Sequence, residues 1–431
     1  MKTRLLISGL AFMWLMVQVD DLRCQSSDLR QLIESGRAAY EKSEFESALG
    51  YFRQADEQRP NHPMITRLLV RLNSLTNRKD DAFANLEKLR LIDADVDFLL
   101  HEDLQVIQGD DRFKGIQSSF DAMNSVEGSF DTAAVITIRR LHPESVAILP
   151  NEQGLLVGSV HEKRIVKITQ DGELQDWISA GEHGLYSVMG MAIDAKRNLL
   201  WVASTAIPQM VWYEEEMDGK AAVFAFDLST KALVKKFEPV GSGKYWFGDL
   251  TLDDEGNVFV SNSLTPEILK ISSVEGEIEQ WKTFGDLVSL QGLAAMDGEL
   301  FFADYLKGVF RTQISDPSNA YSQVNSPEGT ILKGIDGLYA TNDGLISIQN
   351  GVYPNRISLW KLNGDKSAFD SMVYIDKANP AFGEPTLGYV DGDMFYYIAN
   401  SQWSGYYPDG RIFEDEKLKD TYVFKAPIPS N

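Results

Sequence analysis

The sequence predicts a mostly β protein, a six-bladed β-propeller preceded by an α-helical domain, and two observations lead to this fold class. A short pattern of a polar pair, an alternating apolar run, a turn and a second alternating run occurs six times in the chain. Alternating runs on either side of a Gly-containing turn are typical of a β-hairpin with one buried face. Before the first copy, apolar residues instead recur every three to four positions, which indicates amphipathic helices.

The six copies of the hairpin pattern are spaced like the blades of a propeller. The clearest copy runs from Gly248 to Ser263. The copies start at Glu144, Met189, Gly248, Gln291, Asp336 and Pro385. Their spacings of 45, 59, 43, 45 and 49 residues agree with the roughly 40 to 50 residues of one blade. We therefore predict a six-bladed propeller over residues 131–431, with the extra loop from Thr205 to Lys220 on one face of the ring.

Two segments outside the six copies are expected to close the ring. Ala133 to Ile138 is an apolar, β-branched run before the first blade, and Asp420 to Lys425 alternates near the end of the chain. Pairing between them would remove an exposed sheet edge.

The helical pattern over residues 28–122 contains small and aromatic residues at a regular spacing. Small residues at Gly36 and Ala48 would let two helices approach closely, with Phe52 filling the space between them. This region resembles a tetratricopeptide repeat, and the residues that carry the resemblance are Gly36, Ala48, Phe52, Ala55 and Pro60, with Ala82 and Leu86 in a second, weaker copy. The resemblance implies a face that binds a protein partner. The alternative is a cap docked on the propeller, because stable solenoids usually need three or more repeats.

The bulk composition excludes some classes of function. The 431-residue chain has a net charge of −22, which argues against nucleic acid or an anionic membrane surface as a partner, since both need clustered Lys and Arg. It contains a single cysteine, Cys24, so an internal disulfide is excluded.

The first 24 residues have the order of a secretory signal peptide. Basic residues at Lys2 and Arg4 precede an apolar run from Leu5 to Val19, which is short for a membrane span. We expect an exported protein, periplasmic or secreted, with no transmembrane span after removal of the signal. An uncleaved signal is one alternative. Lipid attachment at Cys24 is another, although the residues before it lack the small side chains that such a site needs.

The first residue of each copy is expected to point into one mouth of the central channel, because the innermost strand of each blade starts there. Glu144, Gln291 and Asp336 would then form an oxygen-rich cup on a shared axis. Hard cations such as Ca²⁺ and Mg²⁺ prefer such oxygen ligands. A carboxylate bonded to a neighbouring backbone is the structural alternative for Glu144, and an acid in an Asp-Gly turn is the alternative for Asp336.

At these positions the chain resembles the six-bladed regucalcin and gluconolactonase family. In that family a divalent metal sits in the channel mouth on a Glu of the first blade, Asn residues of the third and fourth, and an Asp of the fifth. Glu144 and Asp336 match the two acids, and Gln291 stands in place of the fourth-blade Asn. The third-blade Asn is replaced by Gly248, which has no side chain, and Asp249 matches the acid that follows it. The resemblance implies a metal site, with calcium expected, on Glu144, Gln291 and Asp336.

The same resemblance implies hydrolysis of a lactone or related ester, a small-molecule substrate bound at the propeller mouth. Asp249 or Asp336 would take the proton from water. His142 and His183 precede the first strands of two blades and are candidate bases at the rim, although a lone histidine is more often structural. The polar and aromatic segment with Asn400 and Trp403 also suits a ligand rim. The competing hypothesis is a non-catalytic propeller that binds a ligand and recruits a protein through its helices.

Overall fold

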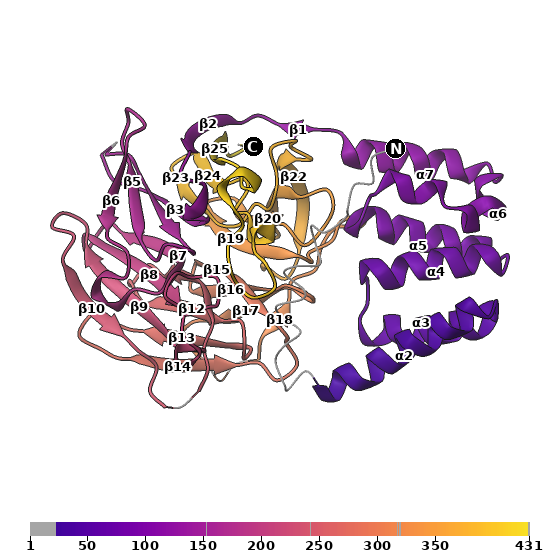
Figure 1. Cartoon of the computed structure of the whole chain (residues 1–431), viewed down its shortest axis with the longest axis horizontal. Coiled ribbons are helices and arrows are strands. Elements are labelled where there is room, and N and C mark those ends of the chain that lie inside the picture. The colour runs from indigo at the N-terminus through magenta and orange to yellow at the C-terminus, as the bar shows by residue number, and fades with distance from the viewer. Residues whose placement is uncertain (1–22, 152, 242, 317, 319, 430–431) are drawn as a thin grey trace.

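The computed structural model describes residues 23–429 apart from 152, 242, 317 and 319. It consists of a helical module and a propeller that lie side by side (Figure 1). The first 22 residues of the expected signal segment lie outside the described residues. Among the described helices, none combines the length and the apolar composition that crossing a membrane requires.

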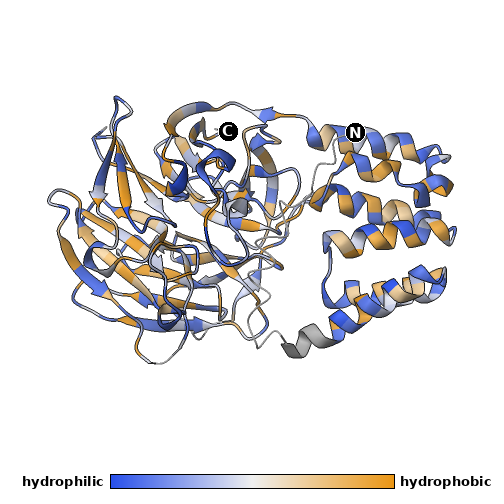
Figure 2. Ribbon diagram, viewed as in Figure 1, coloured by the Kyte–Doolittle hydropathy of each residue, from blue (hydrophilic) through white to orange (hydrophobic). Residues whose placement is uncertain are grey.

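The helical module is a stack of short antiparallel helices. Apolar faces of successive helices meet inside it, as the hydropathy colouring shows (Figure 2). Short 3₁₀ turns separate α5 from α6. The helices are α2 (Arg23–Glu41), α3 (Phe45–Gln58), α4 (Pro63–Leu75), α5 (Lys79–Ile92), α6 (Gln105–Gln108) and α7 (Arg112–Asn124).

The first two helices cross at Gly36, as the repeat pattern predicts. Ala48 and Phe52 are fully buried in α3. A Cβ added to Gly36 would lie 2.7 Å from the ring of Phe52, which is closer than carbon atoms can approach without displacement. The glycine therefore sets the distance between α2 and α3.

The propeller contains six sheets of four strands, one of which carries a fifth. The first three blades, from innermost to outermost strand, are β3 (Pro143–Ile148), β4 (Leu155–Ser159), β5 (Ile165–Ile168) and β6 (Leu174–Ile178); β7 (Ser187–Asp194), β8 (Leu199–Thr205), β9 (Ala221–Asp227) and β10 (Leu233–Phe237); and β11 (Phe247–Leu252), β12 (Val258–Asn262), β13 (Glu267–Ile271) and β14 (Ile278–Thr283). The last three are β15 (Leu290–Met296), β16 (Glu299–Asp304), β17 (Gly308–Gln313) and β18 (Ser322–Gln323); β19 (Ile335–Thr341), β20 (Gly344–Gln349), β21 (Arg356–Leu362) and β22 (Phe369–Lys377); and β23 (Gly388–Asp391), β24 (Met394–Ile398), β25 (Thr421–Pro427) and β2 (Asp131–Ile136).

The ring closes through the two segments that the sequence predicts. β2 pairs antiparallel with β25, with Asp131 opposite Lys425 and Ile136 opposite Thr421. The innermost strands β3, β7, β11, β15, β19 and β23 contact one another in order, and β23 contacts β3. The prediction of six blades is confirmed.

The helical module docks on the fifth blade. The loop between β20 and β21 forms a parallel bridge to the end of α5, where the Ala94 amide donates to the Tyr353 carbonyl at 2.8 Å. The buried Arg356 donates to the Leu91 carbonyl at 2.7 Å. Lys377 donates to the Ala122 carbonyl at 3.0 Å. Both cations thus meet the carbonyl ends of helices, where the helix dipole is negative. The linker strand β1 (Glu127–Gly128) also pairs with β22.

Two glycines of the helical module test the close crossing. Gly36→Ala should lower the free energy of unfolding by about 1 to 3 kcal/mol, because the new methyl group displaces Phe52. Gly50→Ala is the matched control, since a Cβ there meets nothing within 4 Å and replacing a helical glycine should add about 0.5 to 1 kcal/mol. Urea unfolding followed by far-UV circular dichroism measures both. Equal effects of the two substitutions would contradict the packing role of Gly36.

His62, at the start of α4, should make stability depend on pH. Burial, followed by repulsion from Arg59 and Lys333, lowers its pKa to about 4. The unfolded side chain titrates near 6.5, so between pH 4 and 6.5 the unfolded chain binds more protons. The His62 contribution to stability is therefore complete above pH 6.5 and is lost as pH falls towards 4.

His62→Asn should flatten the fall of unfolding free energy between pH 7 and pH 5, because Asn does not titrate and is a good N-cap. His183→Asn is the control: His183 is exposed and has a φ of 57°, a conformation that Asn tolerates. Urea titrations at the two pH values measure the slope. An unchanged slope in His62→Asn would show that another group controls it.

Candidate functional site

β-Bulges direct side chains from the start of the inner strands into the channel mouth. The pairing register shifts there in each of the first five blades, at Pro143/Ser145, Val188/Met191, Phe247/Leu250, Leu290/Leu293 and Ile335/Gly337. A bulge adds one residue to a strand and changes the direction of its side chain. In each of these five blades, the first residue of the sequence copy lies within the register shift. The positions predicted to converge on the channel are therefore the ones at which side chains depart from the regular alternation between the two faces of the strand.

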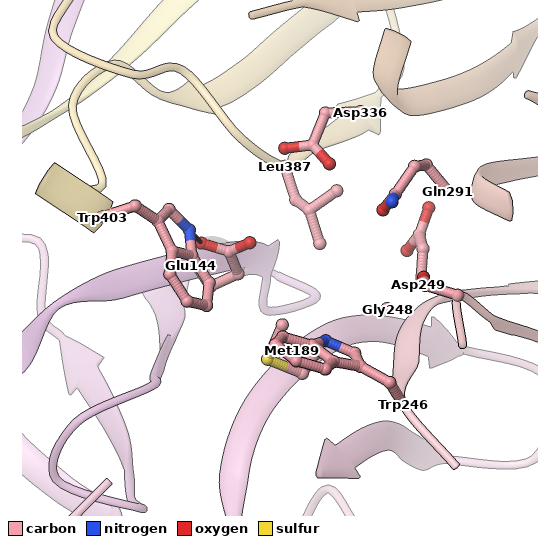
Figure 3. Close-up of a pocket in the computed structure, with 10 residues that line it drawn as sticks. Glu144, Met189, Trp246, Gly248, Asp249, Gln291, Asp336, Leu387 and Trp403 are labelled. Carbon is pink, nitrogen blue, oxygen red and sulfur yellow. Dashed lines mark hydrogen bonds between the residues drawn. The ribbon is translucent and has the colours of Figure 1, made fainter. Parts of the chain in front are cut away.

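These side chains enclose one small cavity (Figure 3). Its volume is about 10 Å³, which suits a single water molecule or ion. The lining residues are Glu144, Met189, Trp246, Gly248, Asp249, Ser263, Gln291, Asp336, Leu387 and Trp403. The structure therefore brings together the three predicted metal ligands and both predicted proton acceptors. In the sixth blade Leu387 lines the cavity in place of Pro385.

Glu144 is buried and held on one side only. Its Oε2 accepts hydrogen bonds from Ser401 Oγ at 2.8 Å and from Trp403 Nε1 at 2.9 Å. Burial raises its pKa well above the ordinary value, and the nearby Asp336 carboxylate raises it further. Figure 3 shows the carboxylates of Glu144 and Asp336 directed towards the same space. The alternative of a Glu144 side chain bonded to a neighbouring backbone does not match these two side-chain donors.

Asp336 and Asp249 are also buried acids with raised pKa values. Asp336 Oδ2 accepts from Asn350 Nδ2 at 2.8 Å, and burial raises its pKa to about 7. Asp249 accepts from the backbone amides of Leu250 at 2.8 Å and Leu293 at 3.4 Å. Burial raises the pKa of Asp249 to about 8 despite these two donors.

A fourth acid, Glu384, belongs to the same group although it does not line the cavity. It accepts hydrogen bonds from the backbone amides of Trp403 and Ser404, and burial followed by repulsion from Asp336 raises its pKa to about 8. Among the described residues, none of these four acids forms an ion pair with Lys, Arg or His. Burying several carboxyl groups without a counter-charge is costly unless they stay protonated or meet a cation.

Gln291 occupies the space that Gly248 leaves free. A Cβ on Gly248 would lie 3.5 Å from Gln291 Oε1 and 3.1 Å from Ser263 Oγ. Gln291 Nε2 donates to Ser289 Oγ at 2.9 Å, which leaves its oxygen as the end directed at the cavity. Gln291 of the fourth blade therefore places its amide oxygen beside Gly248 of the third blade, which has no side chain.

The predicted rim residues are not equivalent in the structure. Trp403 lines the cavity. His142 is buried behind it, with its ring edge-on to Trp403 at 4.7 Å and its Nδ1 hydrogen-bonded to the Tyr406 hydroxyl. Asn400 is buried in backbone contacts, donating to the Asp420 carbonyl at 2.9 Å and accepting from the Tyr422 amide at 2.9 Å. His183 is exposed and lies beside Phe226.

Several residues at the site were not identified from the sequence. Trp246 and Leu387 line the cavity, while Asn350 and Ser401 donate to its acids. Glu384 could have been found, because it directly precedes Pro385 in the sixth copy of the pattern. Ser401 lies within the polar and aromatic segment that also predicted Asn400 and Trp403. Trp246, Leu387 and Asn350 occupy ordinary loop or strand positions and carry no comparable signal.

The family resemblance implies a divalent metal at this site. Its oxygen ligands would have to include an amide as well as carboxylates. Among the described residues, no three side chains of His, Cys, Asp and Glu are grouped so that they could hold a metal ion. Glu144 and Asp336 each keep one carboxylate oxygen for which no hydrogen bond is seen in the described part of the chain, and Gln291 adds an amide oxygen. Two carboxylates and an amide suit Ca²⁺ better than a transition metal.

Comparison with known proteins supports the fold. The chain matches no family model and no curated protein. Its propeller superimposes on the major allergen Mala s 1 of Malassezia sympodialis with a TM-score of 0.53 at 12% identity, covering 68% of this chain and 94% of that one. A gluconolactonase from Xanthomonas campestris gives 0.46 at 12% identity over 69% and 89%. Virginiamycin B lyase from Staphylococcus aureus gives 0.44 at 12% identity over 71% and 100%.

These neighbours cover 68% to 71% of this chain. Structural similarity at such low identity shows the fold alone. The predicted six-bladed propeller, with gluconolactonase among its structural neighbours and a helical module in front, is confirmed at this level. The chemistry has to be argued from the site itself.

Proposed function

We propose that the cavity binds one divalent cation, calcium being the best match, and that the propeller uses it to hydrolyse lactones or related esters. The observation that carries this proposal is the set of buried carboxyl groups around a cavity of ion size, with no basic side chain paired to them in the described part of the chain. The basic and then apolar start of the sequence further supports export to the periplasm or the exterior, where calcium is available.

Glu144, Asp336 and Gln291 would hold the cation. A bound divalent cation supplies polarisation of a carbonyl oxygen and stabilisation of the charge that develops on it. The surrounding residues keep these ligands in place: Ser401 and Trp403 fix one oxygen of Glu144, and Asn350 fixes one oxygen of Asp336.

Asp249 is the residue best placed to accept the proton from the attacking water. It shares the cavity with the proposed ligands, and its raised pKa of about 8 matches that of a base working near neutral pH. Its two backbone donors fix the direction of the carboxylate. Asp336 remains the second candidate for this role, since it also lines the cavity.

Calcium should stabilise the folded protein, since a ligand that binds only the native state raises the unfolding free energy by about 2.7 kcal/mol at a hundredfold excess over its Kd. Glu144→Gln should abolish this rise, because it removes one of two charged ligands while preserving shape. Glu275→Gln, at an exposed hairpin turn, is the matched control and should keep it. Thermal unfolding with and without calcium measures all three proteins. Stabilisation of Glu144→Gln equal to that of the control would contradict the assigned ligand.

Substitutions of Asp249 and Asp336 should have different effects on lactone hydrolysis and on calcium binding. Asp249→Asn should lower kcat by about 10² to 10⁴-fold, the range for loss of a general base, and leave the calcium concentration for half-maximal stabilisation unchanged. Asp336→Asn should weaken calcium binding as well as turnover. If Asp336→Asn lost turnover with unchanged calcium affinity, the two roles would have to be exchanged.

A second candidate function, protein binding without catalysis, is favoured by a cavity in the helical module. It has a volume of about 330 Å³, within reach of the size of ligand pockets. Three arginines lie on its wall together with apolar side chains, and its lining residues are Arg37, Tyr40, Glu41, Phe52, Met64, Arg67, Leu68 and Arg71. Arg67 and Arg71 are neutralised by Asp93, Asp95 and Asp103. Arg37 contacts the Met64 sulfur at 3.2 Å, which suits a partner segment with one acidic and one apolar side chain.

A further inference from the structure

The cavity at the channel mouth is too small for the substrate of the proposed reaction. Its volume of about 10 Å³ holds one water-sized group, whereas sites for small organic ligands usually measure about 300 to 1,000 Å³. Trp246, Trp403, Leu387 and Met189 supply the apolar part of its wall (Figure 3). A lactone carbonyl can reach Glu144 and Asp336 only if part of this wall moves.

Trp403 is the wall residue that lies in the longest connection, since the loops that carry Trp246 and Leu387 are shorter. It lies on a 3₁₀ turn (Trp403–Gly405) within the long connection between β24 and β25. Gln402, just before the turn, has a φ of 73°, a left-handed conformation that is uncommon for residues other than glycine. Such strained positions concentrate at functional sites and mobile elements.

Two acids of the site, the buried Glu144 and the half-buried Glu384, hold this turn in place. Glu144 accepts from Ser401 Oγ and Trp403 Nε1 at 2.8 and 2.9 Å. Glu384 accepts from the backbone amides of Trp403 and Ser404. The acceptors that bind the turn are thus a proposed cation ligand, Glu144, and a neighbouring acid, Glu384. Because Glu144 would bind both the cation and the turn, a change in its contacts with the cation acts directly on the loop.

The outer part of the same connection rests on the second blade. A Cβ on Gly410 would lie 3.1 Å from Cβ of Pro208, in the loop between β8 and β9. Charged residues with side-chain exposures of 54% to 75% cover this part of the connection, namely Asp409, Arg411, Glu414 and Lys417. The outer part thus has the exposure expected of a segment of low local stability, while Trp403 and Leu418 on either side of it are buried and have to be exposed when the connection opens.

We propose that residues 400–420 form a lid and that the space filled by the Trp403 indole is the lactone-binding site. This inference rests on the proposed hydrolase function. The lid lifts by releasing Glu144 and Glu384, the substrate ring takes the place of the indole, and its carbonyl meets the cation ligands. Trp403 then determines which lactones enter, and the exclusion of water when the lid is closed protects the site between turnovers.

A disulfide across the lid tests this directly. Pro208→Cys with Gly410→Cys, in a Cys24→Ser background that removes the native cysteine, places two Cβ atoms 3.1 Å apart, inside the usual disulfide separation of about 3.5 to 4.5 Å. Gly410 has a φ of 83° and a Cβ there would lie 2.7 Å from the Pro208 carbonyl oxygen, so the loop has to shift. The oxidised form is therefore compared with the reduced double variant, which carries the same two substitutions. Oxidation should lower lactone turnover at least about tenfold, because the open form is no longer populated, and dithiothreitol should restore it. The two single-cysteine variants are controls and should respond to neither treatment.

Binding of Tb³⁺, followed by luminescence sensitised by the neighbouring tryptophans, separates a locked lid from a damaged site. The oxidised double variant should still bind Tb³⁺ at equilibrium with an affinity within about threefold of the reduced form, since the cation ligands are unchanged. Equal turnover by the oxidised and reduced forms overturns the lid. Loss of Tb³⁺ binding on oxidation overturns it too, because the effect would then lie in the ligands.

If the wild-type chain hydrolyses none of the lactones, the proposed hydrolase function fails, and the lid is judged by hydrogen exchange instead. Glu384→Gln should speed exchange of the Trp403 and Ser404 amides at least about tenfold relative to wild type, as expected when a local opening becomes more frequent. Glu416→Gln, an exposed acid of the same connection, is the matched control and should leave both amides unchanged. Equal protection in Glu384→Gln and wild type overturns the lid.

Discussion

Pairing of β2 with β25 closes the ring, and the position of every residue at the site depends on this closure. The pairing brings the sixth blade against the first, so that the inner strand β23 contacts β3. The amide of Leu387 then donates to the Glu144 carbonyl at 3.2 Å, and Thr386 Oγ1 donates to the same oxygen at 2.8 Å. Residues more than 240 positions apart in the chain are thereby fixed on one rim. An open sheet would leave Glu144 without Ser401, Trp403 and the acid at position 384.

The fifth blade connects the helical module to the same site through one loop. Residues 350–356 bond the end of α5 by Tyr353 and Arg356, and the first residue of the loop, Asn350, donates to Asp336. Asn350 also accepts from the Tyr305 hydroxyl at 3.0 Å. A partner that moved the helices would thus act on a segment bonded to a proposed cation ligand. This arrangement gives the docking of the helices a physical route to the channel mouth, whichever of the two functions the chain performs.

The sequence contained most of the fold because a propeller is built from local hairpins. Each blade pairs strands that follow one another in the chain, so alternation and turn residues were sufficient to predict them. The closing pair was also recognisable, since Ala133 to Ile138 is a strand-like run that precedes the first of the six copies. The roles assigned to individual residues were harder to infer. His142 and Asn400 do not line the cavity, and both are buried in contacts with other residues, which a single sequence does not reveal.

What the sequence did not contain was the direction of side chains and the contacts across blades. Glu144 is directed by a bulge, and its donors come from the opposite end of the chain. Trp246 reaches the cavity from the segment before β11 and has no distinguishing pattern around it. Such contacts depend on the closed ring as a whole.

Gly248 and Gln291 illustrate why single positions are a poor guide to the geometry of a site. Considered separately, one position has no side chain and the other has a long amide. In the structure, the longer side chain of Gln291 brings its oxygen to 3.5 Å from where a Gly248 Cβ would stand. The two positions therefore have to be considered together, because the amide oxygen of the fourth blade lies beside the third-blade position that has no side chain. The cavity is lined by three carboxyl groups and this amide around a space of ion size.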